Sequence, residues 1–182
     1  CLLLLTGCVV SSPQKAQFNA EYPNRQDIRS HTVYRFMTKP LKPGGGKYYG
    51  ANDLAETLYV RADNAAMVEL RFNYPGRSLQ VKSLDAQNRT LREETYALLD
   101  ASAAKPSDVE SRYFFLTKEG VLLTKHKNCT PDMSVGCRWQ DRTLFITRKG
   151  DMAVQLAKGG AGMAFLGIPF YGSQKYLEIF PK

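Results

Sequence analysis

The stretch MVELRFNYPGRSLQVKSL, residues 67–84, contains two runs of alternating residues separated by a turn signal. In the first run, Val68, Leu70 and Phe72 fall on one side, opposite Glu69 and Arg71. The second run, LQVKSL, alternates in the same way, and NYPG between them is typical of a turn. A two-residue period is typical of antiparallel strands with one buried and one solvated face. The stretch therefore predicts a pair of neighbouring strands on a hydrophobic core.

Similar runs continue through the rest of the chain. The further predicted strands are 31–38, 57–62, 91–100, the arms of two hairpins that turn near 118–120 and 149–151, and the terminal run 174–180. The run 91–100 also fits a short helix, although we favour the strand. About nine strands with little helix predict an all-β domain, built as a single antiparallel β-sandwich or small barrel.

Composition limits the class of protein. The chain has 182 residues, of which 43% are hydrophobic, so it is long enough for one domain with a core and is not disordered throughout. The net charge is +8, but the basic residues are scattered, and the densest cluster is only Lys125-His126-Lys127. Nucleic-acid binding normally needs a basic patch on a recognisable module, so we expect no nucleic-acid partner. The charge does suit an anionic glycan or lipid.

The N-terminal segment CLLLLTGCVVSS, residues 1–12, has the features of an export signal. The leucine run is too short to span a bilayer, and it reads as the end of a signal peptide's apolar core. The following residues, Leu5-Thr6-Gly7-Cys8, resemble the lipobox of bacterial lipoproteins. This resemblance implies that residues 1–7 are a signal remnant and that Cys8 carries acyl chains such as palmitate. It covers only the first dozen residues.

The lipobox resemblance also implies a location and a domain plan. Val9 stands where the family's inner-membrane retention signal has Asp, which favours the outer membrane, facing the periplasm. We expect residues 8–30, which are polar and contain two prolines, to be a lipidated tether. Residues 31–182 would then form the periplasmic β-domain.

Two cysteines remain once Cys1 leaves with the signal and Cys8 is lipidated. Cys129 and Cys137 are separated by a short segment with Pro and Gly, and an oxidising periplasm favours a disulfide between them. Reduced thiols and a metal site are alternatives. The spacing is unusual for zinc and the chain has only two histidines, so we expect no metal.

Catalytic signatures are scarce in this sequence. It contains no G-x-S-x-G, H-E-x-x-H or G-x-G-x-x-G motif, so we expect neither an enzyme nor a bound cofactor. A periplasmic hydrolase that uses His126 or paired carboxylates is the least favoured alternative, because such pairs can assemble in space.

A glycine-rich apolar stretch at 159–172 is the best candidate for a contact surface. Its glycines can equally allow close packing of buried strands. If it is exposed, it offers a surface for a partner or ligand. The candidate residues are Met163, Phe165, Leu166, Phe170 and Tyr171. We therefore expect a binding or assembly subunit of an envelope or secretion complex with a protein partner; the alternative is a carrier of lipid, lipopolysaccharide or peptidoglycan.

Overall fold

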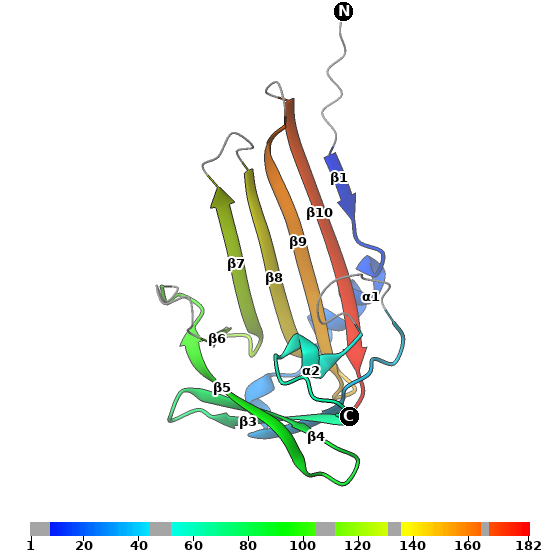
Figure 1. Ribbon diagram of the computed structural model, residues 1–182, viewed down its shortest axis with the longest axis vertical. Helices are drawn as coiled ribbons and strands as arrows, with labels where there is room; N and C mark the ends of the chain where they lie inside the picture. The colour runs from blue at the N-terminus through cyan, green and yellow to red at the C-terminus, as the bar shows by residue number, and fades with distance from the viewer. Residues whose placement is uncertain (1–7, 44–51, 105–111, 131–135, 165–167) are drawn as a thin grey trace, which may run out of the picture.

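The strands of the computed structural model form one open sheet of ten strands in the order β1-β10-β9-β8-β7-β6-β5-β4-β3-β2 (Figure 1). The structure describes residues 8–43, 52–104, 112–130, 136–164 and 168–182. The strands are β1 (Cys8–Ser11), β2 (Val33–Met37), β3 (Met67–Asn73), β4 (Ser78–Leu84), β5 (Thr90–Asp100), β6 (Tyr113–Leu116), β7 (Leu122–Thr130), β8 (Gly136–Ile146), β9 (Met152–Ala164) and β10 (Ile168–Phe180). The short helices are α1 (Lys15–Glu21) and α2 (Leu54–Thr57), with single 3₁₀ turns η1 (Tyr22–Asn24) and η2 (Ile28–Ser30).

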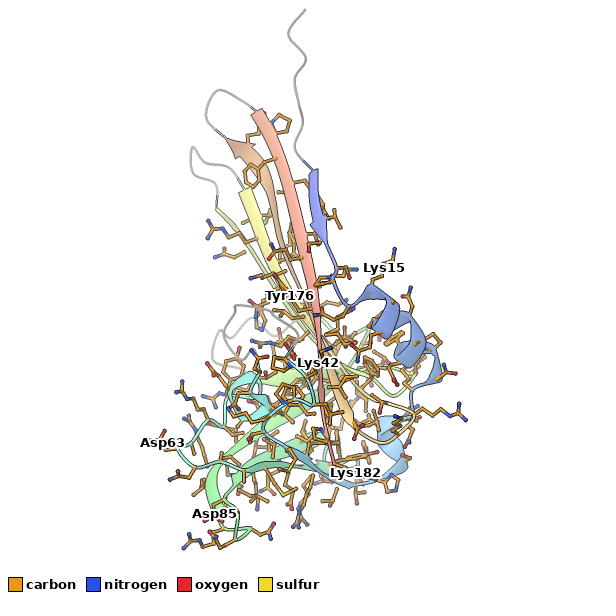
Figure 2. All side chains as sticks on the ribbon, turned by 90° about the vertical axis from the view of Figure 1, so that its right-hand side faces the viewer. Lys15, Lys42, Asp63, Asp85, Tyr176 and Lys182 are labelled. Carbon is orange, nitrogen blue, oxygen red and sulfur yellow. A yellow bond between two sulfur atoms is a disulfide. The ribbon has the colours of Figure 1, made fainter. Side chains whose placement is uncertain are left out.

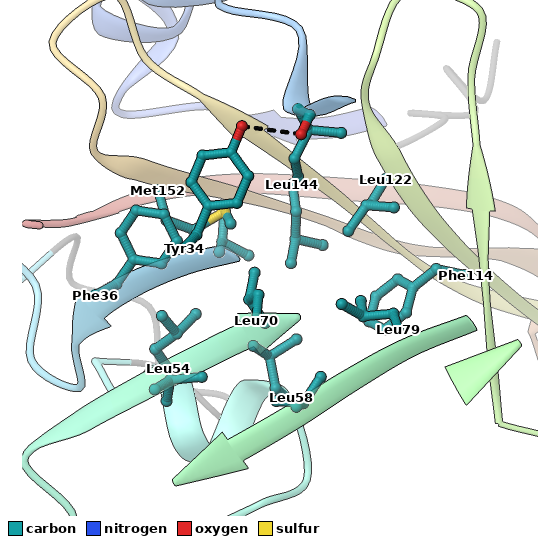
Figure 3. Packing of buried hydrophobic residues seen from close by; sticks show 14 of the residues in the cluster. Tyr34, Phe36, Leu54, Leu58, Leu70, Leu79, Phe114, Leu122, Leu144 and Met152 are labelled. Carbon is teal, nitrogen blue, oxygen red and sulfur yellow. Dashed lines mark hydrogen bonds between the residues drawn. The ribbon is translucent and has the colours of Figure 1, made fainter. Parts of the chain in front are cut away.

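The sheet bends so that its two ends enclose a core. Strands β3, β4 and β5 cross beneath the lower ends of the long strands β7 to β10 (Figure 1). Fully buried side chains such as Phe36, Leu70 and Leu144 meet between the two layers (Figure 3). The all-β prediction is confirmed, and the arrangement is sandwich-like. The sheet does not close into the small barrel, because β1 and β2 remain its two edges.

The alternation in residues 67–84 produces the predicted faces. Val68 and Leu70 of β3 are fully buried, and β3 pairs antiparallel with β4 in the register Leu70↔Val81. On the opposite face, Glu69 accepts hydrogen bonds from Arg35 Nε at 2.7 Å and from Arg71 Nη2 at 3.1 Å. The polar residues of the alternating pattern are therefore cross-linked by ion pairs across the outer face of this layer.

The predicted hairpins are also confirmed. Gly120 turns β6 into β7 with φ of 68°, and Gly150 turns β8 into β9 with φ of 92°. Residues 91–100 lie in strand β5, as favoured, and not in a helix. Two pairings, β5 with β6 and β1 with β10, are parallel, so the sheet is not antiparallel throughout.

The predicted strand at 57–62 is wrong. Asp53 caps helix α2 by accepting a hydrogen bond from the Glu56 amide at 3.1 Å, and the helix ends at Thr57. Tyr59 then adopts φ of 59°, a left-handed conformation that a strand does not contain. Leu58 is buried, as the alternation suggested, but it lies in the turn that follows a capped helix and not in a strand.

Residues 8–30, which we expected to be a lipidated tether, pack against the sheet over much of their length. Strand β1 pairs with β10, and helix α1 and the turn η1 place Phe18 and Tyr22 against Phe145 of β8. Ile28 of η2 is fully buried in the main core. Aromatic stacking and apolar burial hold the segment on the sheet, so residues 8–30 belong to the β-domain.

Candidate functional site

The long strands extend well beyond the core. We call this extension the distal sheet: residues 125–130 of β7, 136–141 of β8, 157–164 of β9 and 168–175 of β10. Figure 2 shows side chains crowded around the core at the lower end and sparse along the distal sheet. In β7, residues 125–129 are all exposed. The exposed strand β7 therefore offers a surface for binding other molecules.

The predicted contact residues gather at the free end of the distal sheet. Met163, Phe170 and Tyr171 are 51%, 46% and 42% exposed. Phe170 and Tyr171 are consecutive in β10, so they point to opposite faces and make both faces of this end apolar. The candidates Phe165 and Leu166 lie outside the described residues.

The predicted lipidation site lies beside these residues. Strand β1 runs parallel to β10 in a register that pairs Cys8 with Tyr171 and Val10 with Ser173. Acylation of Cys8 remains a prediction. Within the described part of the chain, no helix is long and apolar enough to cross a membrane.

The predicted disulfide is confirmed. Cys129 and Cys137 are direct partners across β7 and β8, and their Cα atoms are 4.1 Å apart. The bond joins the two strands near the free end of the distal sheet, beyond the point where β6 pairs with β7. The disulfide therefore holds β7 to β8 where no described strand pairs with the other side of β7.

Close packing at a glycine stabilises the distal sheet from one face. Trp139 of β8 pairs with Gly159 of β9, and a β-carbon built on Gly159 would lie 2.4 Å from the indole Cζ2. The indole also lies 5.7 Å from the Tyr171 ring, between centroids. The predicted use of glycine for close packing is thus confirmed at Gly159. The role of Trp139 was missed, although it is the only tryptophan in the chain.

The edge of the distal sheet is strand β7. Its neighbour β6 pairs only with Leu122 and Leu123, so among the described strands nothing pairs with the outer edge of residues 125–129. Lys125, His126 and Lys127 make this edge basic. Burial raises the pKa of Asp141, the partner of Lys125 in register, although Lys125 and His126 oppose the shift.

The two histidines lie on different elements. His126 is on β7, whereas His31 precedes β2, where its ring contacts Tyr34 at 5.5 Å between centroids. The His31 Nδ1 atom is 3.0 Å from Ser30 Oγ. The two side chains therefore sit in separate surroundings and do not form a pair.

Two adjoining hollows lie on the face of the long strands that continues into the core. The wider one, of about 930 Å³, runs along the distal sheet over Lys158, Gly160 and Gln174. The narrower one, of about 540 Å³, lies where the two layers diverge, and His126 borders both. We call the narrower hollow the basal cleft. The basal cleft was not predicted from the sequence.

A buried cation defines the basal cleft. Arg142 of β8 is only 4% exposed, and its Nη1 donates a hydrogen bond to the Tyr59 hydroxyl at 2.9 Å. Its guanidinium carbon also lies 5.3 Å from the Tyr59 ring centroid. Tyr96 fixes the opposite wall by donating to the Leu58 carbonyl at 2.6 Å, and burial raises the pKa of Tyr96 well above its usual range.

Comparison of the chain with protein-family models, with curated proteins and with solved structures gives no match. The class of protein is therefore defined by fold and surface alone: a sandwich-like β-domain with an open distal sheet and a disulfide-held edge. The function must be inferred from the chemistry of these surfaces.

Proposed function

We propose that this chain is a lipid-anchored binding protein of the bacterial cell envelope, which acts without catalysis as an assembly subunit at the periplasmic side of the outer membrane. One observation carries the proposal: the strand register places Cys8 beside Tyr171, at the exposed apolar end of the distal sheet. The anchor and the candidate contact surface are thus at the same end of the molecule.

An acylated Cys8 would hold this end at the membrane surface. Tyrosine is enriched at the membrane–water interface, because an aromatic body suits the apolar side and a hydroxyl suits the wet side. Tyr171, with Phe170 and Met163, supplies such a surface. The exposed basic residues Lys127 and Arg138 of the distal sheet would add electrostatic attraction to anionic head groups.

The edge of β7 is the surface we assign to a protein partner. Beyond Leu123, no described strand pairs with the outer edge of β7. The positive charges of Lys125 and Lys127 discourage self-association of this edge, because the lysines of two copies would repel each other. They favour instead an acidic partner strand added to the sheet.

Site-specific photocrosslinking in intact cells tests both surfaces. A photoreactive phenylalanine analogue is placed at Tyr171, at Lys125 or, as the control, at Gln87. Gln87 lies in the exposed turn near Asp85, at the opposite end of the molecule from the distal sheet (Figure 2). We expect a phospholipid adduct from position 171 and one dominant protein adduct from position 125. If position 125 gives no more protein adduct than position 87, the assembly role is refuted.

Metabolic labelling tests the anchor separately. Cells grown with labelled palmitate should incorporate label into the chain, and the Cys8→Ser variant should lose both the label and the membrane fraction. Labelled protein from the Cys8→Ser variant, or unlabelled native protein, would contradict the lipid anchor. Cys129 and Cys137 are joined to each other, so they do not compete for the acyl group.

A further inference from the structure

The basal cleft has the size and walls of a small-molecule site. Its volume of about 540 Å³ lies within the range typical of ligand pockets, roughly 300–1,000 Å³. Leu58, Phe114 and Leu144 line it with buried apolar surface, and Tyr59 and Tyr96 add aromatic surface. The cleft therefore combines an apolar wall with polar and aromatic side chains.

Arg142 brings a positive charge into this cavity without a matching negative charge. Among the described residues, no carboxylate lies within salt-bridge distance of its guanidinium, and the Tyr59 hydroxyl is its only hydrogen-bond partner. A guanidinium has five N–H donors, so most of them remain available. Burying a cation without a paired anion is costly, and an anionic ligand would remove that cost.

A second polar group beside Arg142 also lacks a partner. Thr124 pairs with Arg142 across β7 and β8, so both side chains point to the same face, and Thr124 lines the same cleft. The Thr124 hydroxyl is buried and makes no hydrogen bond to any described residue. Buried hydroxyls are normally satisfied, so this one has a donor free for a ligand.

The other arginine that lines the cleft has a carboxylate partner. Arg112 is paired with Glu94, which also pairs with Arg92 at 3.3 Å. Arg142 is therefore the arginine of the cleft that has no carboxylate partner among the described residues. A ligand that balances it carries one negative charge.

We propose that the basal cleft binds a small organic monocarboxylate with an apolar body. The carboxylate would accept from the free guanidinium donors of Arg142 and from the Thr124 hydroxyl, since guanidinium and carboxylate match in a two-pronged geometry. The apolar body would lie against Leu58, Phe114 and Leu144. This inference does not depend on the lipid anchor or on the partner at the β7 edge.

Matched acids and alcohols test the charge requirement on the full chain with its disulfide formed. Octanoate is compared with octanol, and hydrocinnamate with hydrocinnamyl alcohol, in titrations followed by ligand NMR at neutral pH. The two pairs distinguish a straight-chain body from an aromatic one. We expect saturable binding of at least one acid, about ten-fold or more tighter than its alcohol, because charge-assisted hydrogen bonds are lost in the alcohol.

Three variants locate the binding. Arg142→Gln should abolish the preference for acid over alcohol. Thr124→Val, which keeps the shape and removes the hydroxyl, should weaken acid binding by about three- to ten-fold without affecting the alcohol. Ser83→Ala is the matched control, because the Ser83 hydroxyl is also buried without a partner but does not line the cleft. It should leave the preference unchanged.

Acids that bind no better than their alcohols, or a preference that Thr124→Val leaves undiminished, would show that the cleft does not recognise a carboxylate there. Thr124→Val keeps the test valid if Arg142→Gln fails to fold.

Discussion

The indole of Trp139 occupies the space that a side chain on Gly159 would need. A β-carbon at Gly159 would lie 2.4 Å from the indole Cζ2 and 2.5 Å from the backbone oxygen of Gly172. The glycine thus lets three strands of the distal sheet pack closely, and the one tryptophan of the chain reports on that packing.

Replacement of Gly159 by alanine should displace the indole. Because one of the clashing atoms belongs to the backbone of β10, rotation of Trp139 alone cannot relieve the contact. We expect a shift in tryptophan fluorescence and a loss of about 1–3 kcal/mol in the free energy of unfolding, the usual cost of overpacking.

Gly160→Ala is the control for this prediction. A β-carbon at Gly160 meets nothing closer than 3.5 Å, so this variant should keep the native fluorescence. Equal spectra for the two alanine variants would contradict the packing described for Trp139.

Loss of the disulfide should loosen the distal sheet more than the core. A short closed loop contributes roughly 2–3 kcal/mol in the chain-entropy model. If this free energy acts on the local opening of β7 and β8, trypsin should cleave the Cys129→Ala/Cys137→Ala variant near Lys127 and Arg138 about 30- to 160-fold faster. Mass spectrometry of the fragments measures this.

Cleavage at Arg61 provides the internal reference for the disulfide experiment. Arg61 is exposed and lies in the segment after α2, away from the disulfide. Its cleavage rate should not change. A parallel rise at Arg61 would mean that the disulfide stabilises the whole domain and not the edge.

Glu69 should make the free energy of unfolding decrease as the pH becomes acidic. Burial tends to raise the pKa of this carboxyl, but the hydrogen bonds from Arg35 and Arg71 outweigh burial and lower it below 4.5. A pKa lowered by folding stabilises the protein above the unfolded-state pKa, and the contribution disappears as pH falls through the folded-state pKa. Urea unfolding from pH 7 downward should therefore show stability falling below about pH 4.5.

The Glu69→Gln variant should lose this part of the acid dependence. At neutral pH it should also be less stable by about 1 kcal/mol, a modest value because both arginines are about half exposed and solvent screens the pairs. Asp63→Asn, at an exposed turn, should change neutral stability by less than about 0.5 kcal/mol. Identical pH profiles for Glu69→Gln and the native protein would refute the role of the ion pairs.

Phe18→Ala should show that the N-terminal segment is part of the fold. The Phe18 ring stacks on Tyr22 at 4.8 Å and meets Phe145 edge-on at 6.0 Å, between centroids. Its removal should cost about 1–2 kcal/mol in urea unfolding. Lys15→Ala on the exposed side of α1 is the control; equal stability of both variants would mean that α1 does not hold to the sheet.

Much of the sheet could be predicted from the sequence because its strands alternate cleanly and glycines mark its turns. Gly120 and Gly150 both have the positive φ that such turns require. The predictions that failed have a common cause: tertiary contacts set the structure of those segments against the local sequence pattern. Residues 57–62 alternate like a strand, but the cap at Asp53 and the left-handed Tyr59 bury Leu58 in another way.

The candidate site was predicted only in part. The exposed end and the disulfide follow from local features, namely an apolar glycine-rich stretch and two cysteines in a short turn-forming segment. The basal cleft does not, because Thr124 and Arg142 look in sequence like ordinary polar residues on the wet face of a strand. Their burial arises only when the segment at Tyr59 folds over them.

The pairing of β1 with β10 has a consequence for how this protein is made. Among the described strands, β1 comes first in the chain and its partner β10 comes last. Gln14 strengthens the connection, since its side chain accepts a hydrogen bond from the Leu177 amide at 3.3 Å. A sheet joined across nearly the whole chain has high contact order and folds slowly. The sheet of a growing chain is therefore complete only after β10 has been synthesised.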